Sequence, residues 1–246
     1  MNTIGPDDAA WEERFGALFR YAQVGRCVNG VTHDINNILG AIMAYSELVG
    51  LESGLTDQAR GMLEEVVSSV ARCTDLIGTL TSIARKDKIS ADIIEPAKIA
   101  TDVLKLRDYA LRVDRVRLES QVSEDLPTIV ADSPKVLLAL IYLFMNAQEA
   151  VAAAETKILR FRVQREEGGV SFQVWNSGPP LADDAIAQAF EPFQGDKDGL
   201  HLGFGLHAAR QIAALHEGTL TYDPDKGFVL SLPSRNKLLK MINAAD

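Results

Sequence analysis

Residues 24–49 read VGRCVNGVTHDINNILGAIMAYSELV, and apolar side chains recur along this segment at alternating intervals of four and three. The repeat is formed by Val24, Val28, Val31, Ile35, Ile38, Ile42, Tyr45 and Val49. An unbroken heptad pattern of this kind is typical of a helix that packs in a bundle or coiled coil. The pattern therefore predicts one long helix over residues 6–50.

A second apolar stripe follows a polar, glycine-containing break at residues 50–57 and predicts a helix over residues 56–85. It is formed by Leu63, Val66, Val70, Cys73, Ile77, Leu80 and Ala84. Two such helices form an antiparallel hairpin whose apolar seam has nothing to bury it, and pairing two copies gives a four-helix bundle. We therefore expect a homodimer through residues 6–86, in which Cys73 is a small core residue rather than a reactive thiol.

His33 lies off the apolar stripe, at the heptad position that faces solvent most directly. On position alone, an ordinary solvated histidine explains it. Its neighbours suggest chemistry, because Asp34 is adjacent and Asn37 lies one helical turn further on the same face. A neutral imidazole is a usable nucleophile near neutral pH, and a carboxylate that accepts a hydrogen bond from Nδ1 would leave Nε2 free to attack phosphorus.

The second half of the chain predicts a separate domain with helices and a mostly antiparallel sheet, which favours a two-layer α/β sandwich. Residues 87–94 look like a short linker before it. Helices are expected at 95–111, 133–154, 183–190 and 205–216, and strands at 116–122, 128–131, 158–164, 170–175, 219–222 and 227–232. The expected domains are therefore 1–88, the helical hairpin, and 89–246, the α/β domain.

Polar clusters punctuate this second half in a definite order. Asn146 and Glu149 lie on an otherwise apolar, buried helix and need partners; an asparagine oxygen suits Mg²⁺, although a bond to nearby backbone would also explain Asn146. Asn176 and Gly178 follow directly after a strand, and alone they indicate only a turn. Further on, the glycines of a GFGL segment open a helix, where backbone N–H groups can approach phosphate oxygens.

Residues 25–48 resemble the phosphoacceptor helix of bacterial sensor histidine kinases. That family carries an H-[ED]-x-x-[NT] core, which matches His33, Asp34 and Asn37 in the string HDINN. The resemblance implies that His33 is the phosphorylated residue and that Asp34 is its acid/base neighbour. It also implies that Asn37 positions water during dephosphorylation of a partner.

The later clusters, in the order NAQEA, NSGP, FEPF, lysine and GFGL, resemble the ATP-binding domain that histidine kinases share with DNA gyrase, a class of heat-shock chaperones and mismatch-repair ATPases. The FEPF box and the His33 helix select the histidine kinases within that superfamily. The resemblance covers residues 20–233 and implies ATP and Mg²⁺ as cofactors. It assigns nucleotide-site roles to Asn146 (Mg²⁺), Glu149 (the acidic residue one turn on), Asn176 (adenine), Gly178 (adenine pocket), Lys197 (lid, near the phosphates), and Gly203 and Gly205 (phosphate loop).

The expected function is ATP-dependent autophosphorylation on His33 and transfer to an aspartate on a response-regulator receiver domain. Several residues depart from the family pattern: Tyr142 replaces a first asparagine, Asn176 an aspartate and Pro180 a glycine, and His201-Leu202 stands in the lid where Gly-Thr is common. Asn176 and Tyr142 favour one alternative, a phosphotransfer protein whose kinase-like domain has lost ATP, whereas Lys197, Gly203 and Gly205 oppose it. A dimeric non-enzymatic scaffold is the other alternative, and the combination of His33 with Asp34 and Asn37 argues against it.

Composition limits which further partners and which cellular compartment we expect. The formal net charge of −9 argues against a broad nucleic-acid surface. The longest apolar run, 136–145, is about half of the roughly 20 residues that a membrane-spanning helix needs, so no membrane insertion is expected. Two cysteines without a secretory signal favour a reducing cytoplasm. Few residues precede the phosphoacceptor-like helix, so we expect no sensor domain, and a separate sensor protein is a candidate partner.

Overall fold

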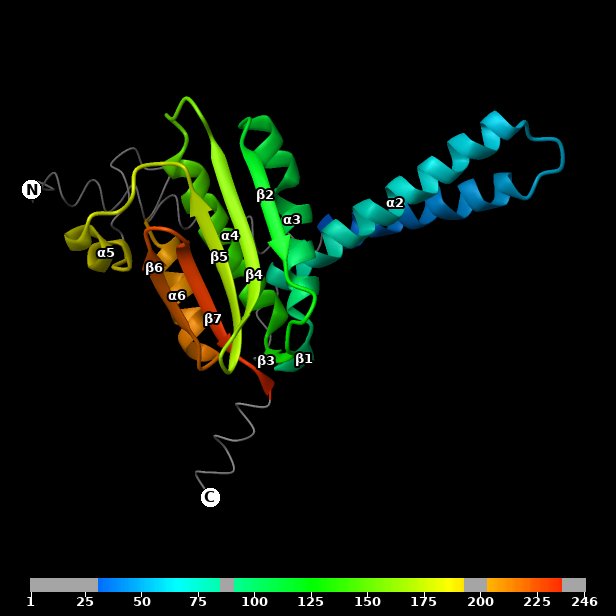
Figure 1. Ribbon diagram of the computed structural model, residues 1–246. Coiled ribbons are helices and arrows are strands. Elements are labelled where there is room, and N and C mark those ends of the chain that lie inside the picture. The colour runs from blue at the N-terminus through cyan, green and yellow to red at the C-terminus, as the bar shows by residue number, and fades with distance from the viewer. Residues whose placement is uncertain (1–30, 85–90, 193–202, 236–246) are drawn as a thin grey trace, which may run out of the picture. The chain divides into compact units, whose positions relative to one another are not determined.

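The computed structural model describes residues 31–84, 91–192 and 203–235, which form two compact units, Met1–Lys86 and Asp87–Asp246 (Figure 1). The described part of the first unit, residues 31–84, is a hairpin of two antiparallel helices, and the second unit contains a β-sheet. No helix within the described ranges is both long and apolar enough to cross a membrane.

The hairpin joins a first helix, described over 31–50, to α2, which spans Asp57–Ala84. The first helix ends in a turn in which the amide of Leu51 donates to the carbonyl of Leu48 at 3.2 Å. Thr56 Oγ1 accepts a hydrogen bond from the amide of Ala59 at 3.2 Å, the contact typical of a residue that caps the start of a helix. Arg60 donates to the carbonyl of Gly50 at 3.3 Å and ties the turn to α2. The predicted hairpin is confirmed over residues 31–84, and the predicted helical residues 6–30 lie outside the described residues.

The heptad stripe of the first helix stays largely exposed in the single chain. Val31, Ile38 and Tyr45 are 55%, 61% and 69% exposed, and Ile35 and Ile42 are 37% and 40% exposed. On α2, Val66 and Leu80 are 39% and 49% exposed, and Cys73 is exposed too. The hairpin by itself therefore leaves the stripe of the first helix and part of the α2 stripe exposed, although Val70 of α2 is buried.

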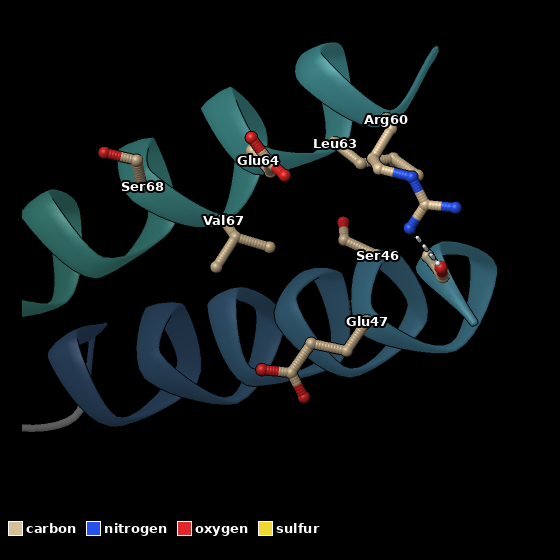
Figure 2. Close-up of a pocket in the computed structure, with 8 residues that line it drawn as sticks. Ser46, Glu47, Arg60, Leu63, Glu64, Val67 and Ser68 are labelled. Carbon is tan, nitrogen blue, oxygen red and sulfur yellow. Dashed lines mark hydrogen bonds between the residues drawn. The ribbon is translucent and has the colours of Figure 1, made fainter. Parts of the chain in front are cut away.

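A neighbouring stripe is covered instead, and it contains Thr32, Leu39, Met43 and Ser46. Figure 2 shows Ser46 of the first helix and Val67 of α2 pointing into the space between the two helices. A pocket of about 350 Å³ remains there near the turn, lined by Ser46, Glu47, Gly50, Arg60, Leu63, Glu64, Val67 and Ser68. The contact between the two helices is consequently incomplete at this end.

The second unit is built on a five-stranded mixed sheet in the order β2-β4-β5-β7-β6. Its strands are β2 (Arg117–Val122), β4 (Ile158–Glu166), β5 (Gly169–Asn176), β6 (Thr219–Asp223) and β7 (Gly227–Pro233). β2 pairs with β4 in parallel, and every other pair in this sheet is antiparallel. The two-layer prediction is confirmed, because helices α3 (Pro96–Val113), α4 (Ser133–Ala150) and α6 (Gly205–Leu215) lie along one face of the sheet (Figure 1).

Helix α4 is the centre of the core. Asp132 caps its start by accepting from the amide of Lys135 at 3.1 Å, and Pro134 occupies its first turn. Phe144 is fully buried and meets Phe161 of β4 edge to face, with ring centroids 5.2 Å apart. The helix ends at Ala150 rather than at the predicted residue 154. The chain turns there, because the backbone amides of Val151 and Ala152 donate hydrogen bonds to carbonyls three residues back.

The expected linker at 87–94 is wrong at its C-terminal end. Asp92–Ile94 forms strand β1, which pairs antiparallel with β3 (Ile129–Ala131) in a separate two-stranded sheet. In β1 only Ile94 is buried, so the strand has no alternation that sequence periodicity could detect. A short helix, α5 (Asp183–Ala189), completes the described elements.

Candidate functional site

His33 lies on the first helix with its side chain 74% exposed, as the heptad position predicts. Its Nδ1 atom is 3.5 Å from Oδ1 of Asp34 and 3.3 Å from Nδ2 of Asn37. The Asp34 side chain is 81% exposed, so water screens its attraction for the ring. The three residues that the sequence analysis singles out therefore meet at one atom of the imidazole.

The contacts of Nδ1 define two alternative states of the ring. When the Asn37 amide donates to Nδ1, the ring proton lies on Nε2, and Nε2 cannot act as a nucleophile. When the ring proton lies on Nδ1, it faces Asp34, and the Nε2 lone pair is free. Asp34 and Asn37 thus favour opposite tautomers of His33, and only the tautomer that Asp34 favours is reactive at Nε2.

In the second unit, Tyr142, Asn146 and Glu149 share one face of α4, since they are spaced four and three residues apart. Asn146 and Tyr142 are half-buried, and Glu149 is exposed. The expectation that Glu149 lies on a helix buried all round is wrong at this end of α4. This face holds the oxygen ligand proposed for Mg²⁺.

Gln148 is the buried polar residue of the NAQEA cluster, and sequence reasoning missed it. Its Oε1 accepts from Arg107 of α3, and its Nε2 donates to Oδ2 of Asp114 at 2.9 Å. Burial lowers the pKa of Arg107, and the charge of Asp114 opposes this shift. Within the described residues, Nε of Arg107 is the one buried side-chain nitrogen or oxygen without a partner. The network anchors the last turn of α4, which carries Asn146 and Glu149, to α3.

The turn after β5 fits closely against the end of α4. Asn176 Oδ1 accepts from the amide of Gly178 at 2.9 Å. A Cβ on Gly178 would lie 2.5 Å from the carbonyl oxygen of Ala150 and 2.8 Å from Asn176 Oδ1, so only glycine fits here. Ser177 holds the turn to β4 because its Oγ accepts from the amide of Ile158 at 3.0 Å and donates to the carbonyl of Thr156 at 2.8 Å.

The N-terminus of α6 meets α4 at Tyr142. Gly203 has φ +58°, a backbone conformation that favours glycine. A Cβ on Gly205 would lie 3.4 Å from Cβ and Cδ1 of the Tyr142 side chain. Burial raises the pKa of Tyr142, so its phenol stays neutral. The N-terminus of α6, whose first-turn amides have no partner within their own helix, therefore lies next to Tyr142, on the face of α4 that also carries Asn146.

Phe190 of the FEPF box is held by α6, a contact that sequence reasoning also missed. His207 Nδ1 lies 3.1 Å from the carbonyl oxygen of Phe190, and the Arg210 guanidinium lies 5.2 Å from the centre of the Phe190 ring. The ring packs edge to face on Phe228 of β7, with centroids 5.9 Å apart. No periodicity links residues 190 and 207, so no sequence signal marks this anchor. Lys197 lies outside the described residues.

These contacts bring the described nucleotide-site candidates, which exclude Lys197, into a single neighbourhood. Tyr142 connects α4 to Gly205, and Ala150 connects α4 to Gly178, so Asn146 and Glu149 lie between the two contacts along the helix. Within 31–84, 91–192 and 203–235, no three His, Cys, Asp or Glu side chains gather into a metal site. Asn146 and Glu149 offer few protein ligands, and such a set of donors suits Mg²⁺ that takes most of its ligands from phosphate and water.

Two family models match the chain. Residues 23–89 match the His Kinase A (phospho-acceptor) domain, and residues 131–236 match the histidine kinase-, DNA gyrase B- and HSP90-like ATPase. The C4-dicarboxylate transport sensor protein DctB of Rhizobium meliloti is 30% identical over 82% of this chain and 32% of its own length. DctS of Rhodobacter capsulatus is 26% identical over 91% of this chain and 36% of its own length.

Solved structures with the same fold include the catalytic domain of histidine kinase ThkA, which is 25% identical, with a TM-score of 0.54, over 60% of this chain and 99% of that one. Full-length ShkA in complex with AMPPNP is 22% identical, with a TM-score of 0.52, over 85% of this chain and 45% of that one. ThkA in complex with the response regulator TrrA is 18% identical, with a TM-score of 0.51, over 91% of this chain and 66% of that one.

A phosphoacceptor domain followed by an ATPase domain defines the histidine kinase core, and the chain belongs to the histidine kinase family. It spans about a third of the length of the first curated relatives that it matches.

Proposed function

We propose that the chain is a histidine protein kinase of a two-component system. It transfers the γ-phosphoryl group of ATP to Nε2 of His33 and then passes it to an aspartate on a response-regulator receiver domain. The observation that carries the proposal is the exposed His33 ring with Asp34 and Asn37 both at Nδ1, in a chain that also contains the ATPase domain.

The chain's own side chains supply the chemistry at His33. The Nε2 lone pair forms the new P–N bond as the P–O bond to ADP breaks, and Asp34 attracts the Nδ1 proton while positive charge develops on the ring. The bare exposure of His33 allows a second protein to reach it. Asn37, on the same face, orients water when a partner's aspartyl phosphate is hydrolysed.

The nucleotide site is proposed to lie between α4, the turn after β5 and the N-terminus of α6. Asn146 binds Mg²⁺ with Glu149 one turn further on. Mg²⁺ would neutralise charge on the phosphates. The base is held by Asn176 and Gly178, and the phosphates by Gly203, Gly205 and Lys197. The close fit of Gly178 against Ala150 and the contact of Gly205 with Tyr142 at the α6 N-terminus support this arrangement.

Residues 1–88 are proposed as the dimerisation and phosphoacceptor domain and residues 89–246 as the ATP-binding domain. A homodimer through residues 6–86 is supported by the exposed heptad stripe and by the match to the phosphoacceptor domain. A response regulator as partner is supported by the ThkA–TrrA complex, to which the chain is similar in fold.

Incubation with γ-labelled ATP and Mg²⁺ tests the kinase activity. We expect label on the protein that is lost in acid and kept in base, because a phosphoramidate is acid-labile and a phosphoserine is not. Label that survives acid would contradict the assignment. No label with ATP, together with label from a phosphorylated receiver domain, would instead identify a phosphotransfer protein.

Asn37→Ala should separate two activities. Labelling of His33 should persist, because removal of the Asn37 amide leaves only Asp34 at Nδ1, and Asp34 favours the reactive tautomer. Hydrolysis of the partner's aspartyl phosphate should slow by about tenfold or more, because the water is no longer oriented. Both rates are measured with one labelled receiver preparation. Asn36→Ala, which removes an exposed amide from a neighbouring face, is the matched control. Equal loss of both activities in Asn37→Ala would point to a purely structural role.

A further inference from the structure

We infer that the nucleotide site, if the proposed function holds, is not selective for adenine: Asn176 presents N–H donors to the base, and the site takes 6-oxopurine nucleotides such as GTP and ITP at least as well as ATP. The inference depends on the orientation of a single amide group. It deepens the proposed function, since it names the class of nucleotide that the same site accepts.

The orientation of the Asn176 amide follows from the backbone around it. The amide N–H of Gly178 lies 2.9 Å from Oδ1 and can only donate. Rotating the side chain by half a turn would place Nδ2 against this N–H, so that two donors would face each other. The oxygen is therefore the atom that points into the turn, and the nitrogen points away from it.

The turn itself has little freedom to adapt. The position of a Gly178 Cβ lies 2.5 Å from the carbonyl oxygen of Ala150, so the turn cannot move closer to α4. The amide of Ser177 donates to the carbonyl of Ile158 at 2.9 Å, and its hydroxyl bonds to Ile158 and Thr156. Gly178 N–H therefore stays where it is, and Oδ1 of Asn176 stays occupied.

Nδ2 of Asn176 is the atom of this side chain that remains available to bind a base. Asn176 is half-buried, and within the described residues Nδ2 has no hydrogen-bond partner. An aspartate at this position would only accept hydrogen bonds, which suits the 6-amino group of adenine. The Nδ2 group donates, so it opposes that amino group and pairs instead with the 6-oxo acceptor of guanine or hypoxanthine.

The size of the effect follows from the cost of leaving a donor against a donor. Leaving a polar group without its partner costs more free energy than a neutral hydrogen bond contributes. We therefore expect matched and mismatched bases to differ about tenfold in affinity. Asn176→Asp should reverse the preference between the two kinds of base, because a carboxylate attracts the amino group of adenine and repels the 6-oxo group.

Calorimetric titration of the whole chain with Mg²⁺ and non-hydrolysable ATP, GTP and ITP analogues tests the inference. We expect the unaltered protein to bind the GTP and ITP analogues as tightly as the ATP analogue or tighter. Asn176→Asp should shift the ratio of affinities toward ATP by roughly tenfold or more. Gln121→Glu makes the same amide-to-carboxylate change at an exposed position of β2 and should leave the ratio unchanged.

The outcomes separate the inference from the proposed function. A clear preference for the ATP analogue in the unaltered protein would overturn the inference while leaving the kinase assignment in place. The ITP arm needs no variant, so it remains decisive if Asn176→Asp fails to fold. Absence of binding by all three analogues in the unaltered protein would contradict the proposed function, and the inference with it.

Discussion

His33→Gln is expected to abolish labelling of the protein by γ-labelled ATP. A glutamine has a similar length and polarity but no ring nitrogen with a free lone pair, so no P–N bond can form. Because the His33 side chain is 74% exposed, the change removes no packing, and the helix content and thermal stability should be unchanged. Labelling is measured by autoradiography after gel electrophoresis, and folding by circular dichroism.

Two controls make this result specific to His33. Asn36→Ala changes an exposed neighbour on the same helix and should label normally. Nucleotide affinity of the His33→Gln protein should also be unchanged, because the proposed nucleotide site lies in the other unit. Persistent label in His33→Gln would move the phosphoacceptor elsewhere and would remove the main support for the kinase assignment.

Replacing Ile35 and Ile42 by aspartate should convert the protein from a dimer into a monomer. Both residues lie on the heptad stripe and are 37% and 40% exposed in the single chain, so the proposed seam would bury them between two copies. A carboxylate without a partner in such a seam costs several kcal/mol. Two of them in each copy should weaken the dimer by more than about a hundredfold in dissociation constant. Light scattering at micromolar concentration measures the change.

Ala44→Asp provides the matched control for the dimer. Ala44 is exposed on the same helix but lies off the stripe, so its aspartate should leave the dimer intact. A monomeric unaltered protein would contradict the proposed dimer, and an Ile35→Asp, Ile42→Asp protein that stays dimeric would place the interface elsewhere.

Local patterns in the sequence determined most of the secondary structure. The heptad stripes predict both helices of the hairpin, since each depends only on spacing along one helix. The starts of α3, α4 and α6 fall within one residue of prediction, helped at α4 by Pro134 in the first turn, although the capping residue is Asp132 and not the predicted Ser133. The exposure of His33 and its shared face with Asn37 follow from the same helical geometry. The order of the polar clusters indicates the family.

Only the tertiary structure decided which atoms meet across the chain. Strand β1 forms because Asp92–Ile94 finds β3, not because its three residues have a pattern. The exposure of Glu149, the burial of Gln148 and the contact of His207 with the Phe190 carbonyl all depend on segments far apart in sequence. The sequence determines that an asparagine stands at 176, but the N–H of Gly178, held in place between β4 and the end of α4, decides which end of its amide faces outward. Hydrogen-bond orientation is a property of the packed turn, and no spacing along the chain records it.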